Sequence, residues 1–322
     1  MFSKRFCQSC LLEFIFLILI ITNLFSYQLI YSNNGISGRI YNDIDELRKS
    51  VGEFNDALIG VFIKPDDVID DVSFLCLGSS SKAFLAEELG FLIGVYLKKH
   101  GVNFCISGFP LVLSPNVETE VLDSKDFVSS SPYVTAQILE LYHLGLIRSG
   151  IFPVIDASNG FDIDVISSLK TRGVYLPVLL REEQYEDFLR LKYDVPTLVR
   201  KNKGIFWNAS ADISRYLYFK WTEKADDWDM KAKELRKRII NSSIVLVKRG
   251  RFNKIKVVSS EEDLKGIDMD TGIILIDDPY LVNPKKVAGL VVIFSNDDVV
   301  INEATEILKG SRVSTGKITW VF

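Results

Sequence analysis

The sequence predicts an α/β protein built around a (β/α) barrel that is shorter than a full one. Residues 84–99 carry apolar side chains at steps of three and four, which is typical of an amphipathic helix. Short apolar runs at 102–106 and 151–155 flank a second helical segment at 133–148. This strand–helix–strand order is typical of parallel sheets and barrels. Only roughly 200 residues are available for the barrel, the low end for eight strand–helix units, so we predict an eroded barrel.

The other elements follow from the same patterns in chain order. Residues 43–54 predict a surface helix, and the apolar run 57–64 predicts a strand that ends before Pro65. Further predicted elements are helices at 162–171 and 182–192 and strands at 173–180, 197–199 and 204–207. The chain then has a charged helix at 231–240, apolar strands at 243–248, 272–280 and 289–294, and a helix at 299–309. Apolar periodicity weakens over 222–238, which we interpret as a boundary between two units.

The first 26 residues have the pattern of an export signal. Lys4 and Arg5 precede an apolar run at 14–25, and the small residue Ser26 follows it. The run is short for a membrane span, which needs about 20 apolar residues. We therefore predict a signal peptide at 1–26 that is cleaved, with an uncleaved signal-anchor as the alternative. In both cases the protein is expected to be exported: periplasmic, extracellular or membrane-anchored outside the cytoplasm.

Composition restricts the partners. The chain of 322 residues has a net charge of −4 and no basic block, which argues against nucleic acid. A membrane contact is expected only through the N-terminal segment, if it is uncleaved. Cys7 and Cys10 lie within that segment without a second pair to complete a zinc site. Cys76 and Cys105 are expected to be buried thiols, with a disulfide between them as the alternative. We predict no metal and no cofactor.

Several stretches resemble glycoside hydrolase family 3 proteins. In the barrel region these are Leu77-Gly-Ser-Ser, Ala86-Glu-Glu-Leu-Gly, 97–104 and 142–153. The last of them resembles the helix and strand that precede the family's Lys-His-Phe-Pro-Gly signature. Near the C-terminus, 243–248, Pro279-Tyr280 and 310–319 resemble the family's second domain, an α/β sandwich. The resemblance implies a degenerate, shortened relative: a TIM-like barrel domain at 33–240 and a truncated α/β sandwich domain at 243–322.

The same comparison implies that sugar-binding and catalytic positions of the family are lost. Leu111 stands where the family has an Asp that holds a sugar hydroxyl, and Lys125 stands where it has an Arg. The Lys-His-Phe-Pro-Gly signature falls on residues 156–160, where the glycine alone matches and both cations are gone. The two histidines, His100 and His143, are interpreted as surface or packing residues rather than as acid/base groups.

A few residues remain as candidates for a site. Asp162 and Asp212 are candidates for relocated catalytic carboxylates, although each could instead open a helix as its N-terminal cap. Asp156 stands at the first position of the lost signature, and Asp164 follows a strand beside the predicted barrel mouth. Trp207 belongs to an aromatic concentration that could stack on sugar rings or fill a buried strand. Asp156, Asp164 and Trp207 are therefore candidates for ligand binding.

These losses predict an exported protein without glycosidase activity that binds a glycan, such as a cell-wall polysaccharide, or serves as a scaffold. The alternative is an active β-glycosidase or β-N-acetylhexosaminidase that hydrolyses O-glycosyl bonds with relocated carboxylates. A third interpretation is an exported α/β protein unrelated to the family. The sequence leaves open whether the chain is an enzyme, and the answer depends on which side chains meet at the barrel mouth.

Overall fold

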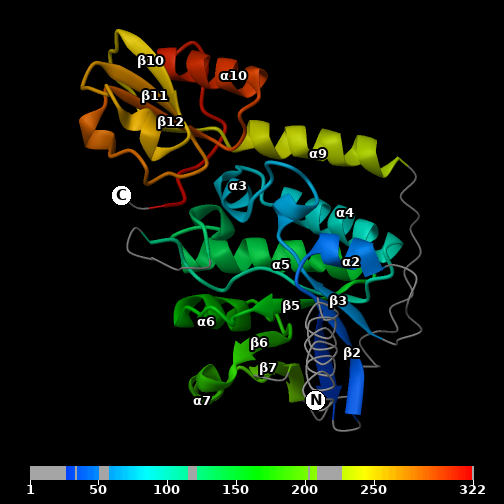
Figure 1. Ribbon diagram of the computed structural model, residues 1–322. Coiled ribbons are helices and arrows are strands. Elements are labelled where there is room, and N and C mark those ends of the chain that lie inside the picture. The colour runs from blue at the N-terminus through cyan, green and yellow to red at the C-terminus, as the bar shows by residue number, and fades with distance from the viewer. Residues whose placement is uncertain are drawn as a thin grey trace, which may run out of the picture.

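The computed structural model in Figure 1 describes residues 27–32, 35–50, 58–114, 122–201, 204–208 and 227–320. The predicted signal at 1–26, Asp212 and residues 222–226 of the predicted boundary lie outside these residues. For Trp207 the backbone alone is described. The predictions that concern these parts therefore stay predictions.

Eight strands form a closed barrel. They are β1 (Tyr27–Ser32), β2 (Gly35–Tyr41), β3 (Ile59–Phe62), β4 (Phe104–Ile106), β5 (Phe152–Asp156), β6 (Val178–Arg181), β7 (Thr197–Lys201) and β8 (Gly204–Asn208). Strands β2 to β7 are parallel to one another. β1 and β8 run antiparallel to β2 and β7, and the parallel pairing of β1 with β8, Ile30 opposite Ile205, closes the barrel.

Helices connect the parallel strands, as the sequence predicts. They are α2 (Ile44–Ser50), α3 (Phe74–Ser79) and α4 (Leu85–Lys99), then α5 (Pro132–Arg148), α6 (Ile163–Thr171) and α7 (Tyr185–Arg190). β7 and β8 pair from Lys201 and Gly204 outward, which leaves two residues between them, too few for a helix. The predicted erosion is therefore visible between β7 and β8: the strand number is complete, but this connection is too short for a helix and the two strands are antiparallel.

The two longest helices of the barrel layer, α4 and α5, pack at very close range. Gly90 of α4 faces the Tyr142 carbonyl oxygen, which would lie 1.9 Å from a Cβ added at position 90. Gly145 of α5 faces the Glu87 carbonyl oxygen in the same way, at 2.1 Å. Ser131 caps α5, and Pro132 begins it, a favoured residue at a position whose N–H needs no partner. Two reciprocal glycines thus let the helix backbones touch.

The barrel interior is a packed core. It consists of Ile40, Leu58, Phe104, Ile106, Val154, Leu179, Leu198 and Ile205, each at most 5% exposed, with Phe62 and Phe152 packed against them. Side chains that alternate along each strand supply these residues, as in other barrels with filled interiors. Because these side chains fill the described part of the interior, we expect a ligand to meet the barrel at one of its ends.

A second, smaller sheet follows the barrel in the chain. Its order is β10-β11-β12-β9, formed by β9 (Val245–Lys248), β10 (Lys254–Val258), β11 (Thr271–Ile276) and β12 (Gly289–Ile293). β10, β11 and β12 are parallel, and β9 is antiparallel to β12. Helix α10 (Asp298–Lys309) packs against this sheet, and α9 (Trp228–Ser242) leads into it along the helical layer of the barrel (Figure 1).

One hydrophobic core joins the small sheet to the barrel helices. It includes Leu89 of α4, Ile239 of α9 and Ile274 of β11, all fully buried. The predicted change of domain between 240 and 243 falls at the end of α9. It stays a prediction that the two parts are separate folding units. To separate, they would have to expose the hydrophobic core that they share.

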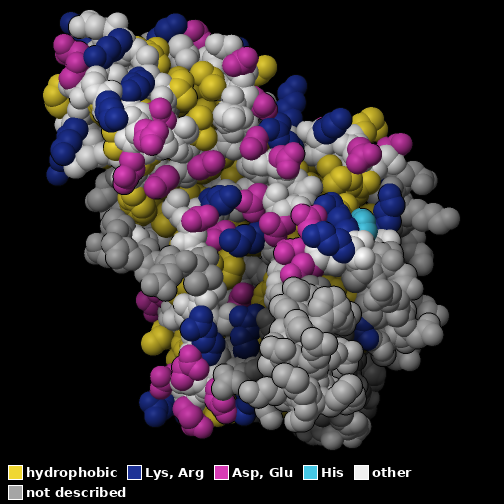
Figure 2. All heavy atoms as spheres, in the orientation of Figure 1, with side chains coloured by type: hydrophobic (Ala, Val, Ile, Leu, Met, Phe, Trp, Pro, Cys, Tyr) yellow, Lys and Arg dark blue, Asp and Glu magenta, His cyan; other side chains and the backbone are white. Residues whose placement is uncertain are grey.

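Neither positive nor negative side chains predominate on the face of the molecule shown in Figure 2. Figure 2 shows basic and acidic side chains interleaved over both the barrel and the small sheet. None of the helices described is long and apolar enough to span a membrane. Cys76 and Cys105 are free, fully buried thiols, so the alternative of a disulfide between them is not realised. Cys76 Sγ lies 3.1 Å from Ser243 Oγ instead.

Candidate functional site at the barrel mouth

The parallel strands β2 to β7 end at one rim of the barrel, which we call the barrel mouth. In enzymes with parallel barrels this rim carries the active site. Val154, Leu179 and Leu198 point into the interior from β5, β6 and β7. Because strand side chains alternate, the residues two positions further on the same strands share that direction. These residues are Asp156, Arg181 and Arg200.

Asp156 is the buried carboxyl of the barrel mouth. It is 6% exposed, and its Oδ1 accepts hydrogen bonds from Ser158 Oγ (2.6 Å) and Ser158 N (3.0 Å). Burial raises the pKa of Asp156, while the Ser158 hydrogen bonds and the charges of Arg200 and Arg181 act to lower it. The turn that holds Asp156 ends at Gly160, whose φ of 121° favours glycine. The candidate site residue Asp156 therefore does lie in the mouth.

Arg200 crosses the mouth from β7 to β3. Its guanidinium carbon lies 4.9 Å from the ring centre of Phe62, on the strand four places away around the barrel. Its Nε atom is buried and has no hydrogen-bond partner among the described residues. Burial lowers the pKa of Arg200, and the charge of Arg181 adds to this while Asp156 opposes it. The Arg200 guanidinium thus lies across the mouth, and its Nε–H donor has no acceptor among the described residues.

Arg181 stands beside Arg200 on the neighbouring strand. The two residues are register partners between β6 and β7. Arg181 Nη2 donates to Asn159 Oδ1 at 3.2 Å, a neutral partner on the turn after β5. Sequence reasoning missed both arginines, although each stands at or next to the end of a short apolar strand run. That position was the available signal, because strand ends of a parallel barrel meet at the mouth.

Of the other candidate residues, Asp162 and Asp164 do not join this group. Asp162 is the N-terminal cap of α6: its Oδ1 accepts from Asp164 N (2.8 Å) and Val165 N (3.1 Å). Asp164 is exposed in the first turn of that helix. Trp207 lies on β8 opposite Leu198, and Asp212 lies outside the described residues. The cap accounts for Asp162 without catalysis.

Both histidines serve packing, as the sequence analysis expects. His143 is fully buried on α5, with Nε2 2.9 Å from the Ser107 carbonyl oxygen, and burial lowers its pKa to about 4. His100 ends α4, where its ring lies 4.4 Å from that of Tyr96. A neutral, buried imidazole bound to a backbone carbonyl is a poor candidate for acid/base work in an open site.

Carboxylates after β3 are engaged in ion pairs. Asp126 accepts from Lys64 Nζ at 2.6 Å, and Asp66 pairs with Lys125 at 2.9 Å. Lys125 therefore binds a carboxylate instead of taking the sugar-binding part of the family's Arg. Burial raises the pKa of Asp126, while the Lys64 hydrogen bond acts to lower it. This cluster ties the loop before α5 to the end of β3.

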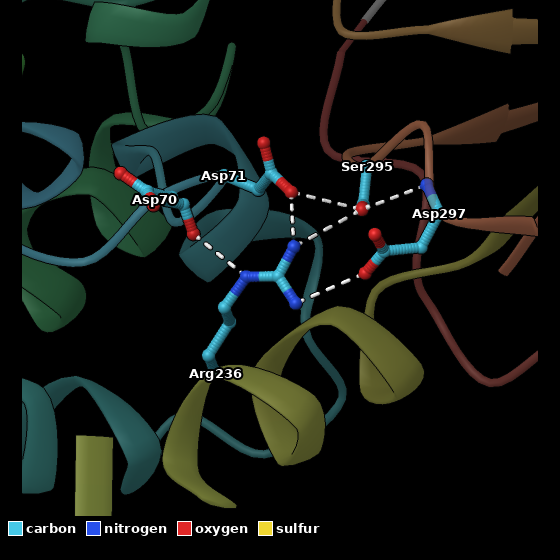
Figure 3. A network of polar contacts seen from close by, with 5 residues as sticks. All are labelled: Asp70, Asp71, Arg236, Ser295 and Asp297. Atoms are coloured by element: carbon cyan, nitrogen blue, oxygen red, sulfur yellow. Dashed lines mark hydrogen bonds and ion pairs between the residues drawn. The ribbon is translucent and has the colours of Figure 1, made fainter. Parts of the chain in front are cut away.

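A network centred on Arg236 of α9 joins the barrel to the small sheet (Figure 3). Arg236 donates to the Asp70 carbonyl oxygen (3.0 Å), Asp297 Oδ2 (3.0 Å) and the Asp71 carboxylate. Ser295 Oγ completes the network by donating to Asp71 Oδ2 at 2.9 Å. Because the Arg236 guanidinium and Ser295 Oγ bond to partners within the network, we interpret it as a structural junction and not as a binding site.

Two further features lie away from the barrel mouth. A hollow of about 250 Å³ opens between α4 and α9, lined by Phe91, Leu92 and Leu235 with charged side chains around them. The C-terminal segment docks on the loop before α5, where the Thr319 carbonyl oxygen accepts from Ser129 Oγ (2.7 Å) and Ser130 N (2.6 Å). Among the residues described, no cluster of three or more His, Cys, Asp or Glu has the arrangement of a metal site.

Solved structures with this architecture identify the fold. "Beta-glucoside phosphorylase BglX" aligns with a TM-score of 0.64 and 10% identity, covering 91% of this chain and 92% of that chain. A fungal multi-domain GH3 β-N-acetylglucosaminidase aligns with a TM-score of 0.59 and 10% identity, over 89% of this chain and 57% of its own. The family 3 β-N-acetylglucosaminidase from Paenibacillus sp. str. FPU-7 gives 0.52 and 11%, over 89% and 93%.

No protein-family model matches the sequence, and no curated protein matches it. The similarity is therefore one of structure, because identities of 10–11% are too low for a sequence comparison to detect it. It confirms the α/β class and the order of barrel and small sheet. Over most of its length the chain has the fold of glycoside hydrolase family 3 proteins.

Proposed function

We propose that this protein is a carbohydrate-binding member of the family 3 fold that acts outside the cytoplasm and does not hydrolyse glycosides. The observation that carries the proposal is the composition of the barrel mouth. The buried carboxyl that the described residues place there, Asp156, is held by Ser158 and lies near two arginines. A retaining glycosidase instead needs two carboxyl groups about 5–5.5 Å apart, one as nucleophile and one as acid/base.

The chemistry supports a binding role over a hydrolytic one. General acid catalysis needs a proton donor that can reach the leaving oxygen, and it contributes roughly 10²–10⁴-fold. Asp156 Oδ1 accepts two hydrogen bonds from Ser158, which hold the carboxyl in one orientation, and burial raises its pKa against the lowering effect of the two arginines. Hydrogen-bonding groups at the rim of a packed barrel remain suited to holding a sugar, whose hydroxyls both donate and accept.

The active-enzyme alternative rests on Asp162 and Asp212. Asp162 has a complete structural explanation as the cap of α6. Asp212 remains a prediction from the sequence, as does the export signal at 1–26. Export is supported by the order of basic, apolar and small residues in that segment. Mass spectrometry of the N-terminus of the secreted or membrane-bound protein tests it, and a soluble cytoplasmic protein with an intact Met1 would contradict it.

A pull-down tests the proposed binding. The purified protein is incubated with insoluble peptidoglycan, cellulose and chitin, and the bound fraction is measured. We expect retention on at least one glycan that is lost on adding its soluble fragments. Asp162→Ala serves as a control, because a capping residue should not affect retention. A protein that stays in solution with every polysaccharide would refute the proposal.

A further inference from the structure

Positive charge reaches the barrel mouth from strands where the family signature does not place it. The signature cations fall on β5, where this chain has Asp156 and Ala157. Arg181 and Arg200 stand one and two strands further on, side by side in register. The mouth therefore carries two arginines on strands other than the one on which the signature falls.

These two charges are incompletely balanced within the described part of the chain. Asp156 is the carboxylate whose charge acts on Arg200, and it acts on Arg181 as well. Lys201 and Glu182, also at this rim, neutralise one another at 2.7 Å. Arg181 has an uncharged partner in Asn159. Two guanidinium groups and one carboxylate leave one positive charge in the mouth.

Arg200 is the more informative of the two arginines. Holding a guanidinium against Phe62 while its buried Nε lacks a partner costs free energy, because an unmade buried hydrogen bond is unfavourable. Two neighbouring guanidinium groups repel one another as well. An oxyanion placed between them would accept hydrogen bonds from both and cancel the excess charge. Guanidinium groups bind carboxylates in this way, through two parallel N–H donors.

We propose that the barrel mouth binds an acidic sugar, a uronic-acid type of residue, with its carboxylate held between Arg181 and Arg200. This inference rests on the proposed glycan binding and adds the class of sugar. Asp156, fixed by Ser158, would accept hydrogen bonds from hydroxyls of the same ring, while the arginines take its charge. The ligand class thus differs from that of a neutral glucoside in one group, a carboxylate in place of a hydroxymethyl.

That single difference defines the experiment. The full chain is titrated calorimetrically with 4-nitrophenyl β-D-glucuronide and, in parallel, with 4-nitrophenyl β-D-glucoside. We expect the glucuronide to bind at least about tenfold more tightly, the gain of one charge-assisted bidentate contact. Added salt should weaken glucuronide binding more than glucoside binding, because charge attraction in an open rim is screened.

Variants then locate the binding. Arg200→Gln and Arg181→Gln should each remove most of the preference for the glucuronide. Arg200→Lys keeps the positive charge but lacks the paired N–H donors of a guanidinium, so it should retain part of the preference for the glucuronide. Arg190→Gln is the matched control, since Arg190 is an exposed arginine whose described partner is Asp187 on its own helix. Melting curves show which variants are folded. If Arg200→Gln does not fold, the glucuronide preference of Arg200→Lys tests the role of Arg200 instead.

The outcomes separate this inference from the proposed function. Equal binding of glucoside and glucuronide overturns the acidic-sugar inference and leaves glycan binding standing. Binding of inorganic phosphate or acetate as tightly as the glucuronide also overturns it, in favour of a simple anion site. Binding of neither sugar here, together with no retention on any polysaccharide, refutes the proposed function itself. A glucuronide preference that survives in Arg181→Gln and Arg200→Gln places the carboxylate elsewhere and refutes the assignment.

Discussion

Replacing Arg236 should loosen the junction between the barrel and the small sheet. The side chain is 25% exposed and donates to the Asp70 carbonyl oxygen, to two carboxylates and, at 3.4 Å, to Ser295 Oγ. Arg236→Ala removes these bonds together and leaves Asp71 and Asp297 without their cation. The barrel turn that holds Asp71 and the end of β12 then lose their shared partner (Figure 3).

The loss of stability in Arg236→Ala depends on how well water can replace the hydrogen bonds of the arginine. A hydrogen bond to a charged group contributes about 1.5–3 kcal/mol when it is buried. The carboxylates of Asp71 and Asp297 are 33% and 49% exposed, so solvent will recover part of the loss. We therefore expect Arg236→Ala to lower the free energy of unfolding by about 2 kcal/mol, well below the sum of the separate bonds because solvent replaces much of what they contribute.

Arg238, two residues further along α9, is the matched control. It makes a bidentate pair with Glu88 at 2.6 and 3.1 Å, but both side chains are about 40% exposed, at 39% and 42%. Arg238→Ala should cost no more than about 1 kcal/mol, as exposed pairs do. Urea unfolding followed by tryptophan fluorescence measures both variants. Equal losses in the two would refute the view that the Arg236 network is a junction and not another surface pair.

Three further perturbations test other parts of the structure. Gly90→Ala should lower stability by at least about 2 kcal/mol although alanine is the better helix former, because its Cβ would lie 1.9 Å from a backbone oxygen; unchanged urea unfolding would contradict the close contact of α4 and α5. Asp162→Ala should cost about 1 kcal/mol through the lost cap, and nitrophenyl glycoside assays should show no activity in either protein; a wild-type turnover that this change abolishes would make Asp162 catalytic. Burial and the nearby acids Asp71, Asp66 and Asp278, opposed by Lys125, raise the pKa of Asp277 to about 6. The protonated form is thus favoured in the fold, and this contribution is complete below the ordinary pKa of 3.8 and is lost as the pH rises through about 6. Asp277→Asn should therefore raise the melting temperature above pH 6 and change it little below pH 4. Solvent still reaches part of Asp277, which weakens the effect of burial, so we expect a gain of no more than about 1 kcal/mol. An equal shift at every pH would contradict this origin.

The elements that the sequence predicted well are those with strong local signals. The helix expected at 84–99 is Leu85–Lys99, and the one expected at 133–148 is Pro132–Arg148. Both have long apolar stripes and clear end signals. The apolar runs on either side of the second helix indicated the parallel strands β4 and β5. The helix expected at 182–192 is a short 3-10 turn followed by α7, since its polar start offers little to bury.

The arrangement at the mouth could not be predicted in the same way. An apolar run indicates a strand but carries no direction, so the antiparallel course of β8 was not visible. The approach of Arg200 to Phe62 depends on closure of the barrel across four strands, and no local pattern encodes it. Asp156 was recognised only because the family signature falls on it. Residues meet at the mouth through strand register, which the sequence determines only through the whole fold.

The central claim is that the barrel mouth holds a sugar and leaves its glycosidic bond intact. One nuclear magnetic resonance experiment addresses both halves: the protein is mixed with 4-nitrophenyl β-D-glucuronide, and saturation transfer to the sugar protons and the anomeric signals are recorded over several hours. We predict transfer to the sugar protons in the wild type, strong reduction of that transfer in Arg200→Gln, and no anomeric signals of free sugar. Signals of free glucuronic acid that grow with time, or an absence of any transfer, would contradict the claim.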